Sequence, residues 1–266
     1  MDDRPESSNA DEPEKVTVNE VMSGHVLTAY SHSSVRKAIE TMASNAIGSV
    51  VVVDSSGPRG VFTERDLLSK VLAKGRDPDG ALLMEVLSPL FVAISPTATL
   101  MDAAKTMIEK KSGLMVFEGG DLVGMVTATD IVRHIQRMRI TIGLSSVIAS
   151  PVFTELPETP LATVVKEMDK RRIGSVLAAE EEARPYGIFT ERDLIAKVLA
   201  RKLSLEFAVG ELASVPLITA GISVDGVEAS RIMMSKHIRR LPLTRDRAIV
   251  GIVTARDVVE AFARST

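Results

Sequence analysis

The chain has 266 residues, of which 45% are apolar and 25% charged, and its formal net charge is −3. This composition is that of a globular protein with room for about two domains, and its charge gives no general attraction to nucleic acid. No apolar run approaches the roughly 18 to 20 residues of a membrane-spanning helix. The absence of cysteine excludes disulfides, thiol catalysis and cysteine-based metal sites. These features predict a cytoplasmic protein without a membrane span.

The N-terminal stretch MDDRPESSNADEPEK is acidic and polar, which predicts a disordered tail over residues 1–15 rather than a signal peptide. The chain that follows contains four similar segments, and such repeats decide the fold. Their boundaries are expected at 16–76, 82–139, 142–202 and 205–264. Because so few residues lie outside the repeats, no fused effector domain is expected.

Each repeat begins with a short strand-like stretch, followed by a helix, two further strands and a second helix. In the first repeat, Val35, Ile39 and Met42 mark one apolar face of the predicted helix at spacing i, i+4, i+7. The second and third repeats show the same spacing at Leu100, Ala104 and Met107 and at Leu161, Val165 and Met168. The pattern predicts an α+β protein built from four β-α-β-β-α units.

The most specific common feature is the motif Gly-apolar-apolar-Thr-x-x-Asp, which occurs once in each repeat where the third strand ends and the last helix begins. Its threonines and aspartates are Thr63 and Asp66, Thr127 and Asp130, Thr190 and Asp193, and Thr254 and Asp257. The first and third copies are nearly identical, because residues 62–73 and 189–200 differ at only two of twelve positions. This indicates that a module of two repeats was duplicated as a whole.

The motif has two interpretations. In the first, the threonine caps the helix and the aspartate completes a capping box, with about 1 kcal/mol for each cap. In the second, the helix N-terminus and the threonine hydroxyl bind a phosphate, and the aspartate accepts hydrogen bonds from the two hydroxyls of a ribose. Two features favour the second. Aspartate is shorter than the Glu or Gln that capping boxes prefer, and the glycine would let the backbone approach a ligand closely.

The four repeats resemble cystathionine β-synthase (CBS) domains in their strand and helix pattern, their motif and its spacing, over residues 16–264. The resemblance implies that adjacent repeats pair, sheet against sheet, to form two Bateman modules at 16–140 and 141–264. It also implies that clefts between paired repeats bind adenosine-containing ligands such as AMP, ADP, ATP, NAD or S-adenosylmethionine. In that family the motif threonine contacts phosphate and the motif aspartate contacts ribose.

The resemblance also implies an adenine position at the start of the first strand of each repeat, often around a threonine. Thr28, Thr154 and Thr219 fall at this position. The second repeat departs from the pattern with Val92, which puts adenine binding there in doubt and predicts that this site binds most weakly.

Arginines near the motif are the candidate phosphate ligands. Arg239 and Arg240 match the family's phosphate-facing arginine before a Leu-Pro step, which gives the fourth site the best set of cations. Arg65, Arg192 and Arg256 lie within the motif itself, and each either supplies charge to a neighbouring ligand or is a solvated residue at the helix start.

Together these features predict a stand-alone regulatory protein that senses cellular energy by binding AMP, ADP or ATP and passes a conformational signal to an effector protein that is unknown. A nucleic-acid-binding or scaffold protein regulated by nucleotide is the alternative, allowed by basic stretches such as the one at residues 133–139. An enzyme is not expected, because the four histidines are scattered and no catalytic or metal-ligand spacing occurs. No cofactor is predicted, and the modules are expected to pair within one chain or in a homodimer.

Overall fold

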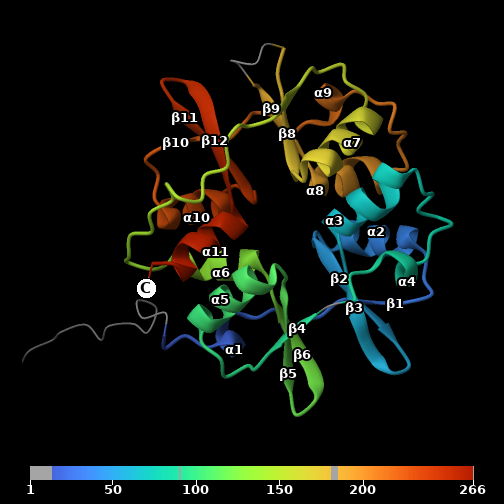
Figure 1. Ribbon diagram of the computed structural model, residues 1–266, viewed down its shortest axis with the longest axis vertical. Helices are drawn as coiled ribbons and strands as arrows, with labels where there is room; N and C mark the ends of the chain where they lie inside the picture. Colours follow the sequence, from blue (N-terminus) through green and yellow to red (C-terminus); the bar gives the residue numbers. More distant parts are fainter. Residues whose placement is uncertain (1–13, 90, 181–184, 266) are drawn as a thin grey trace, which may run out of the picture. The chain divides into compact units, whose positions relative to one another are not determined.

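The computed structural model describes residues 14–89, 91–180 and 185–265 of the chain, so most of the predicted acidic tail lies outside the described residues. Four three-stranded sheets have the same topology, with strand orders β1-β2-β3, β4-β5-β6, β7-β8-β9 and β10-β11-β12 (Figure 1). In each sheet the first strand is parallel to the second and the third is antiparallel to it. The predicted α+β fold with four repeats is therefore confirmed.

The elements of the first half follow the predicted order. Repeat 1 contains α1 (Val18–Val21), β1 (Thr28–Tyr30), α2 (Val35–Ser44), β2 (Ser49–Asp54), β3 (Gly57–Thr63) and α3 (Glu64–Asp66). A π-helix at Leu67–Val71 and a 3₁₀ turn at Leu72–Lys74 continue α3. Repeat 2 contains α4 (Leu83–Val86), β4 (Val92–Ile94), α5 (Leu100–Lys110), β5 (Leu114–Glu118), β6 (Asp121–Val126) and α6 (Ala128–Ile135).

The second half repeats this order. Repeat 3 contains β7 (Thr154–Glu155), α7 (Leu161–Arg171), β8 (Ser175–Ala178), β9 (Gly187–Thr190), α8 (Glu191–Asp193) and a π-helix at Leu194–Leu199. Repeat 4 contains α9 (Val209–Leu212), β10 (Ala220–Gly221), α10 (Gly226–Ser235), β11 (Arg240–Arg245), β12 (Ala248–Thr254) and α11 (Ala255–Ala263). Repeats 1 and 3 thus share a π-helix after the motif, whereas repeats 2 and 4 continue as α-helices.

The apolar faces predicted from the sequence are the buried faces of the helices. Val35, Ile39 and Met42 of α2 are almost completely buried. The corresponding residues of α5 and α7 are buried in the same way: Leu100, Ala104, Met107, Leu161, Val165 and Met168. The spacing i, i+4, i+7 therefore identified the helix faces that form the core.

The described chain divides into two compact units that alternate along the sequence. One unit contains repeat 2 with repeat 4, and comprises the leading segment up to Val26, Phe91–Pro151 and the chain from Thr219 onward. The other contains repeat 1 with repeat 3, and comprises Leu27–Leu90 and Val152–Ile218. In the second unit α2 and α3 lie beside α7 and α8, and in the first α5 and α6 lie beside α10 and α11 (Figure 1).

The hydrophobic core of the unit that contains repeats 1 and 3 is shared by both repeats. A single buried cluster joins the helices of repeat 1 to those of repeat 3, with Ile39 and Phe62 on one side and Val165 and Phe189 on the other. The helices of this unit therefore meet between alternate repeats. The two-module architecture itself is confirmed.

Adjacent repeats are linked by an exchange of their leading segments. In each repeat the third strand forms a two-bond antiparallel bridge with a short segment that the sequence assigns to the start of a repeat. The bridges join Val61 to Ser88, Met125 to Ser23, Ile188 to Ser214 and Ile252 to Ala149. The segment after α1 therefore lies on repeat 2, and the segment after α4 lies on repeat 1. Repeats 3 and 4 exchange their segments in the same way.

The motif glycine makes room for this exchanged segment. A Cβ atom at Gly60 would lie 2.2 Å from the carbonyl oxygen of Ser88, and one at Gly251 would lie 2.4 Å from the Cγ2 atom of Ile148. The sequence suggested that this glycine lets the backbone approach a ligand. The structure instead places another part of the protein against it, so its requirement is one of packing.

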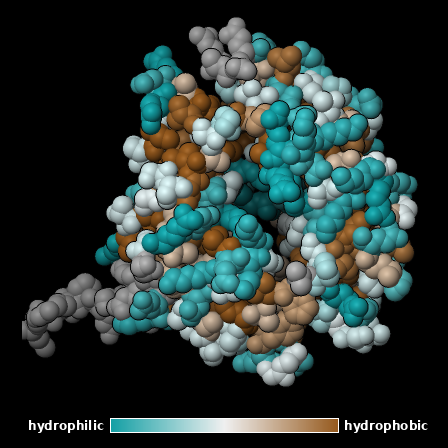
Figure 2. Space-filling view, in the orientation of Figure 1, coloured by the Kyte–Doolittle hydropathy of each residue, from teal (hydrophilic) through white to brown (hydrophobic). Residues whose placement is uncertain are grey.

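The surface carries both polar and apolar side chains. Figure 2 shows hydrophilic side chains over much of the visible face and hydrophobic side chains gathered over β11 and β12 of repeat 4. Within the described ranges, every helix is too short or too polar to cross a bilayer.

Candidate functional site

The motif threonine and aspartate form a capping box in all four repeats. The backbone amide of the threonine donates to the aspartate Oδ2 atom over 3.0, 2.8, 2.9 and 2.7 Å in repeats 1 to 4. The threonine hydroxyl donates to the same oxygen over 2.6, 2.6, 2.6 and 2.8 Å. Aspartate is therefore long enough to close the box, and the sequence argument from its short side chain was wrong.

A fifth copy of this box occurs outside the motif. Thr99 and Asp102 at the start of α5 make the same contacts, with the threonine amide 3.2 Å and its hydroxyl 2.8 Å from Asp102 Oδ2. Asp102 is exposed, whereas Asp66, Asp130 and Asp193 are buried. The box alone thus indicates a helix cap, and burial of the carboxylate distinguishes the motif aspartates of repeats 1 to 3 from Asp102.

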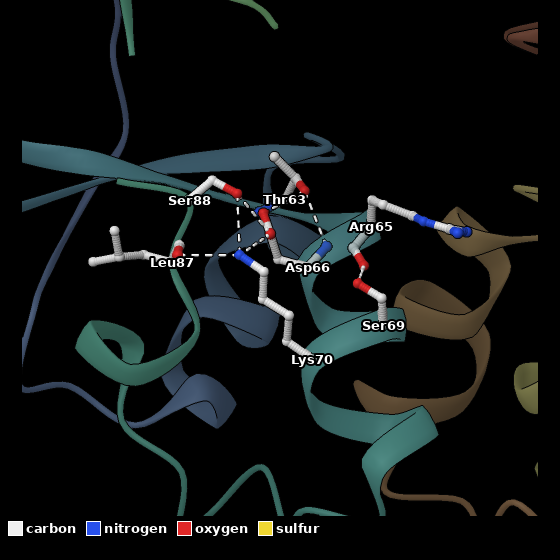
Figure 3. A network of polar contacts seen from close by, with 7 residues as sticks. All are labelled: Thr63, Arg65, Asp66, Ser69, Lys70, Leu87 and Ser88. Carbon is white, nitrogen blue, oxygen red and sulfur yellow. Dashed lines mark hydrogen bonds and ion pairs between the residues drawn. The ribbon is translucent and has the colours of Figure 1, made fainter. Parts of the chain in front are cut away.

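The second oxygen of the Asp66 carboxylate is held by a lysine and a serine (Figure 3). Lys70 Nζ lies 2.7 Å from Asp66 Oδ1, and the Ser88 hydroxyl donates to the same oxygen over 2.8 Å. Lys70 also donates to the carbonyl oxygen of Leu87 and to the Ser88 hydroxyl, each over 3.1 Å. All the acceptor positions of the carboxylate are therefore used within the protein, since a carboxylate has about four lone-pair sites.

Repeat 3 reproduces this arrangement. Lys197 Nζ lies 2.9 Å from Asp193 Oδ1, and the Ser214 hydroxyl donates to that oxygen over 2.9 Å. Lys197 also donates to the carbonyl of Leu212 over 3.0 Å and to the Ser214 hydroxyl over 2.8 Å. We call the pairs Lys70 with Ser88 and Lys197 with Ser214 the lysine–serine clamps. Each clamp lysine lies within the π-helix of its repeat.

Repeat 2 has a looser version of the clamp. Arg133 Nη1 lies 2.9 Å from Asp130 Oδ1, and the Ser23 hydroxyl lies 3.3 Å from it. His134 occupies the position of the clamp lysine, four residues after the aspartate. Burial lowers the pKa of His134, and the charge of Arg137 lowers it further, so the imidazole is neutral at physiological pH.

Repeat 4 lacks both parts of the clamp. Ala149 forms the bridge that Ser88 and Ser214 form elsewhere, and Ala261 stands four residues after Asp257. Within the described part of the chain, Asp257 Oδ1 makes no hydrogen bond or ion pair. Burial raises the pKa of the Asp257 carboxyl, although its hydrogen bonds from Thr254 act in the opposite direction. Asp257 is thus a desolvated carboxylate with one oxygen available as an acceptor.

The motif arginines contact the repeat that shares their core. Arg65 donates to the carbonyl oxygen of Ile173 over 3.0 Å and lies 3.5 Å from Glu191. Arg192 donates to the carbonyl of Ala46 over 2.8 Å, and Arg256 to that of Met107 over 3.1 Å. These guanidinium groups therefore join repeat 1 to repeat 3 and repeat 4 to repeat 2, a role that neither sequence interpretation contained.

Arg240 is well placed to act with the motif of repeat 4. It pairs directly with Thr254 across β11 and β12, and the carbonyl oxygen of Arg239 accepts a hydrogen bond from the first helical amide, that of Ala255. The residues in the same register position of repeats 1 and 3 are Ser49 and Ser175. A cation beside the motif threonine is thus a property of repeat 4 and not of repeats 1 and 3.

The predicted adenine-side threonines occupy equivalent positions. Thr28 and Thr154 each open the first strand of their sheet, and Thr219 directly precedes β10. Thr154 lines a shallow pocket with Glu155, Leu156 and Ala179.

The register corrects one position in repeat 2. Thr28 pairs with Val51, and Met115, which takes the place of Val51 in the sheet of repeat 2, pairs with Ala93 rather than with Val92. The expected absence of threonine at this position of repeat 2 holds, but the residue there is Ala93.

Sequence reasoning did not identify the clamp residues. The lysines could have been found, because Lys70 and Lys197 are among the residues that the two near-identical copies share. The serines follow the short helices α4 and α9, so only the exchange of leading segments brings Ser88 and Ser214 to the motif.

The comparison with known families identifies the four repeats. The family model of the CBS domain matches residues 18–73, 83–137, 144–200 and 209–264, and the chain belongs to this family. The match indicates no enzymatic family.

Two archaeal proteins are among the similar curated sequences. Uncharacterized protein MJ1404 of Methanocaldococcus jannaschii is 24% identical over 92% of this chain. Uncharacterized protein MK0525 of Methanopyrus kandleri is 34% identical over 45% of this chain. In each case the match covers 62% of the length of the relative.

A solved structure supports the fold over most of the chain. The crystal structure of protein MJ1225 from Methanocaldococcus jannaschii, described there as a proposed archaeal homologue of g-AMPK, has a TM-score of 0.77. It is 20% identical in sequence and covers 93% of this chain and 100% of its own. At this identity the likeness establishes the fold.

Proposed function

We propose that this protein is a regulatory sensor that binds an adenine nucleotide at its CBS repeats and passes a conformational signal to another protein. The observation that carries the proposal is the Thr-x-x-Asp capping box at a helix start in every repeat, with the carboxylate buried in repeats 1 to 3 and half-buried in repeat 4. The family's mode of binding, in which the threonine contacts phosphate and the aspartate contacts ribose, maps onto these residues one by one. A helix N-terminus also attracts phosphate through its free amides and partial positive charge.

The structural relative supports the same ligand class. Protein MJ1225 is described as a proposed homologue of g-AMPK, and AMP is one of the ligands that CBS modules bind. AMP, ADP and ATP share the ribose and the phosphate that the motif would contact. Binding can signal only if the ligand has different affinities for two conformations of the protein.

The proposal is tested by measuring nucleotide binding to the full chain. We expect AMP, ADP or ATP to raise the melting temperature by mass action, because the unfolded chain has no site. Isothermal titration calorimetry then gives the affinity and the number of sites. A variant with all four motif aspartates replaced by asparagine should lose the shift. Asp102→Asn removes the same capping carboxylate at a position outside the motif, and it should keep the shift.

Two results would contradict the proposal. One is the absence of a shift with AMP, ADP and ATP. The other is a full shift in the variant without motif aspartates. Steeply salt-dependent binding of DNA or RNA in the absence of any nucleotide response would instead favour the nucleic-acid alternative.

A further inference from the structure

The four motifs are not equivalent, although their capping boxes are nearly identical. In repeats 1 and 3 the outer oxygen of the aspartate, Oδ1, already has two partners within the protein. In repeat 2 it has a cation and a more distant serine. In repeat 4 that oxygen makes no hydrogen bond or ion pair with any residue that the structure describes, and Ala149 and Ala261 stand where the clamp would be.

We propose that the lysine–serine clamps close the ribose positions of repeats 1 and 3, and that repeat 4 is the nucleotide-binding repeat, with Asp257 accepting from the ribose hydroxyls. The inference rests on the proposed function and specifies which of the four motifs binds the nucleotide. It assigns Lys70 and Lys197 as residues that exclude ligand, and Asp257 as the residue that binds it.

The hydrogen-bond capacity of the carboxylate closes the ribose positions of repeats 1 and 3. A ribose offers two hydroxyl donors to the carboxylate. At Asp66 and Asp193 these donors would have to displace a lysine ammonium at 2.7 or 2.9 Å together with a serine hydroxyl. Each of these contacts is charge-assisted and stronger than a bond between neutral groups. The ribose hydroxyls would therefore displace lysine and serine contacts that are at least as strong as the hydrogen bonds they would form.

In repeat 4 the aspartate still has hydrogen-bond capacity to spare. Asp257 Oδ1 gains its first partners when a diol binds, and a half-buried carboxylate oxygen that accepts no hydrogen bond is costly to maintain. A second, independent feature points to the same repeat. Arg240 lies opposite Thr254, so a cation stands beside the threonine that would contact the phosphate. Ribose and phosphate contacts therefore coincide in one repeat.

The experiment is calorimetric titration of the full chain with AMP, using changes that open or close individual motifs. The unmodified protein should bind one AMP per chain with high affinity. Asp257→Asn should weaken binding by at least about tenfold, because it replaces an acceptor with a donor at the outer position. If the clamps close repeats 1 and 3, Asp66→Asn and Asp193→Asn should change the affinity by less than about twofold, and Asp102→Asn, outside the motif, is the control.

A clamp can also be moved between repeats. Ala149→Ser with Ala261→Lys should build a clamp on Asp257 and weaken AMP binding by at least about tenfold. Because Ala261 is buried, Ala149→Ser alone, at an exposed position, is the milder variant and should weaken binding measurably. In the reverse direction, Lys70→Met with Lys197→Met should open two further sites and raise the stoichiometry from one toward three.

The ligand side offers an independent test. 2′-Deoxy-AMP lacks one of the hydroxyls, and its affinity should be lower than that of AMP in the unmodified protein but equal to it in Asp257→Asn. The inference is overturned if Asp193→Asn abolishes AMP binding while Asp257→Asn does not, or if the unmodified chain binds AMP equally at three or four sites. In both cases the proposed function would stand. Failure of AMP, ADP and ATP to bind at all would refute the proposed function itself.

Discussion

Arg65 of repeat 1 donates a hydrogen bond to the carbonyl oxygen of Ile173 in repeat 3, and Arg192 of repeat 3 donates in return to the carbonyl of Ala46 in repeat 1. The two contacts are reciprocal, and each arginine directly precedes a motif aspartate. Because Ile173 and Ala46 follow the ends of α7 and α2, the guanidinium groups also satisfy carbonyls near helix C-termini. The pair fixes how the two motif helices of this unit meet.

We therefore expect Arg65→Ala to destabilise the protein. The variant loses a charged hydrogen bond across the core of repeats 1 and 3, and such bonds contribute about 1.5 to 3 kcal/mol. The Arg65 side chain is 35% exposed, so we expect a loss of unfolding free energy near the lower end of this range. Urea unfolding measures the change. Thr129→Ala, at the corresponding position of repeat 2, is the control and should change the unfolding free energy by less than about 0.5 kcal/mol.

The second prediction separates the contribution of the helix cap at Asp193 from that of the lysine–serine clamp. Asp193→Ala should lower the unfolding free energy by about 2 to 3 kcal/mol, since it removes the cap and leaves Lys197 and Ser214 without their acceptor. Asp102→Ala removes only an exposed cap and should cost about 1 kcal/mol. Thermal or urea unfolding of both variants tests the difference. Equal losses would mean that the clamp adds nothing to the stability of repeat 3.

The third prediction concerns the exchanged segments. Gly60→Ala should destabilise the protein strongly, by more than about 2 kcal/mol, because the new methyl group would collide with the backbone at Ser88. Gly143 has no atom within 4 Å of the position of a Cβ. Gly143→Ala should therefore be neutral or slightly stabilising. Comparable melting temperatures for the two variants would show that the segment after α4 can move away from β3 at little cost.

The fourth prediction follows from the raised pKa of Asp257. As the pH falls through this pKa, the carboxylate is protonated and becomes a weaker hydrogen-bond acceptor. The affinity for adenosine should therefore begin to fall at a higher pH than it would if the aspartate had an ordinary pKa. Adenosine is the suitable ligand because it has no phosphate to titrate. Calorimetry across acidic pH checks the change, and in Asp257→Asn the dependence should disappear.

The same pKa has a consequence for stability with a definite sign. The folded-state pKa of Asp257 lies above its ordinary value of 3.8, so the native state holds this proton more tightly than the unfolded state does. The contribution is present at low pH and is lost as the pH rises through the folded pKa. Asp257→Asn should therefore gain stability relative to the unmodified protein as the pH is raised from about 4 to neutrality. The negative charge of Glu260 adds to the rise in the pKa of Asp257, and the positive charge of Arg256 opposes it.

Much of the fold could be predicted from local pattern. Val35, Ile39 and Met42 define a buried helix face by their spacing alone, and the threonines of the motif mark helix starts because capping is a local interaction. The partner of each helix face could not be predicted in this way. Nothing near Ile39 in the sequence states that it meets the helices of repeat 3 rather than those of repeat 2.

The candidate site, too, could be predicted from the sequence only in part. Thr254 and Asp257 were identified because they lie three residues apart in a repeated motif. Their difference from Thr190 and Asp193 depends on Ala149, more than one hundred residues before Asp257 in the chain, which only the folded structure brings to the motif. The correction from Val92 to Ala93 has a different origin. Strand pairing sets the register to within one residue, and resemblance between short segments does not.

The exchange of leading segments has a consequence for synthesis. The bridge partner of Ser23 is Met125, which is synthesised about one hundred residues later. The helices of repeat 1 can complete their core only after the helices of repeat 3 have been synthesised, that is, after Leu199. At about 5 to 20 residues per second, the nascent chain spends several seconds with apolar helix faces uncovered. We expect such a chain to depend on chaperones during translation and to fold late, in few cooperative steps, rather than repeat by repeat.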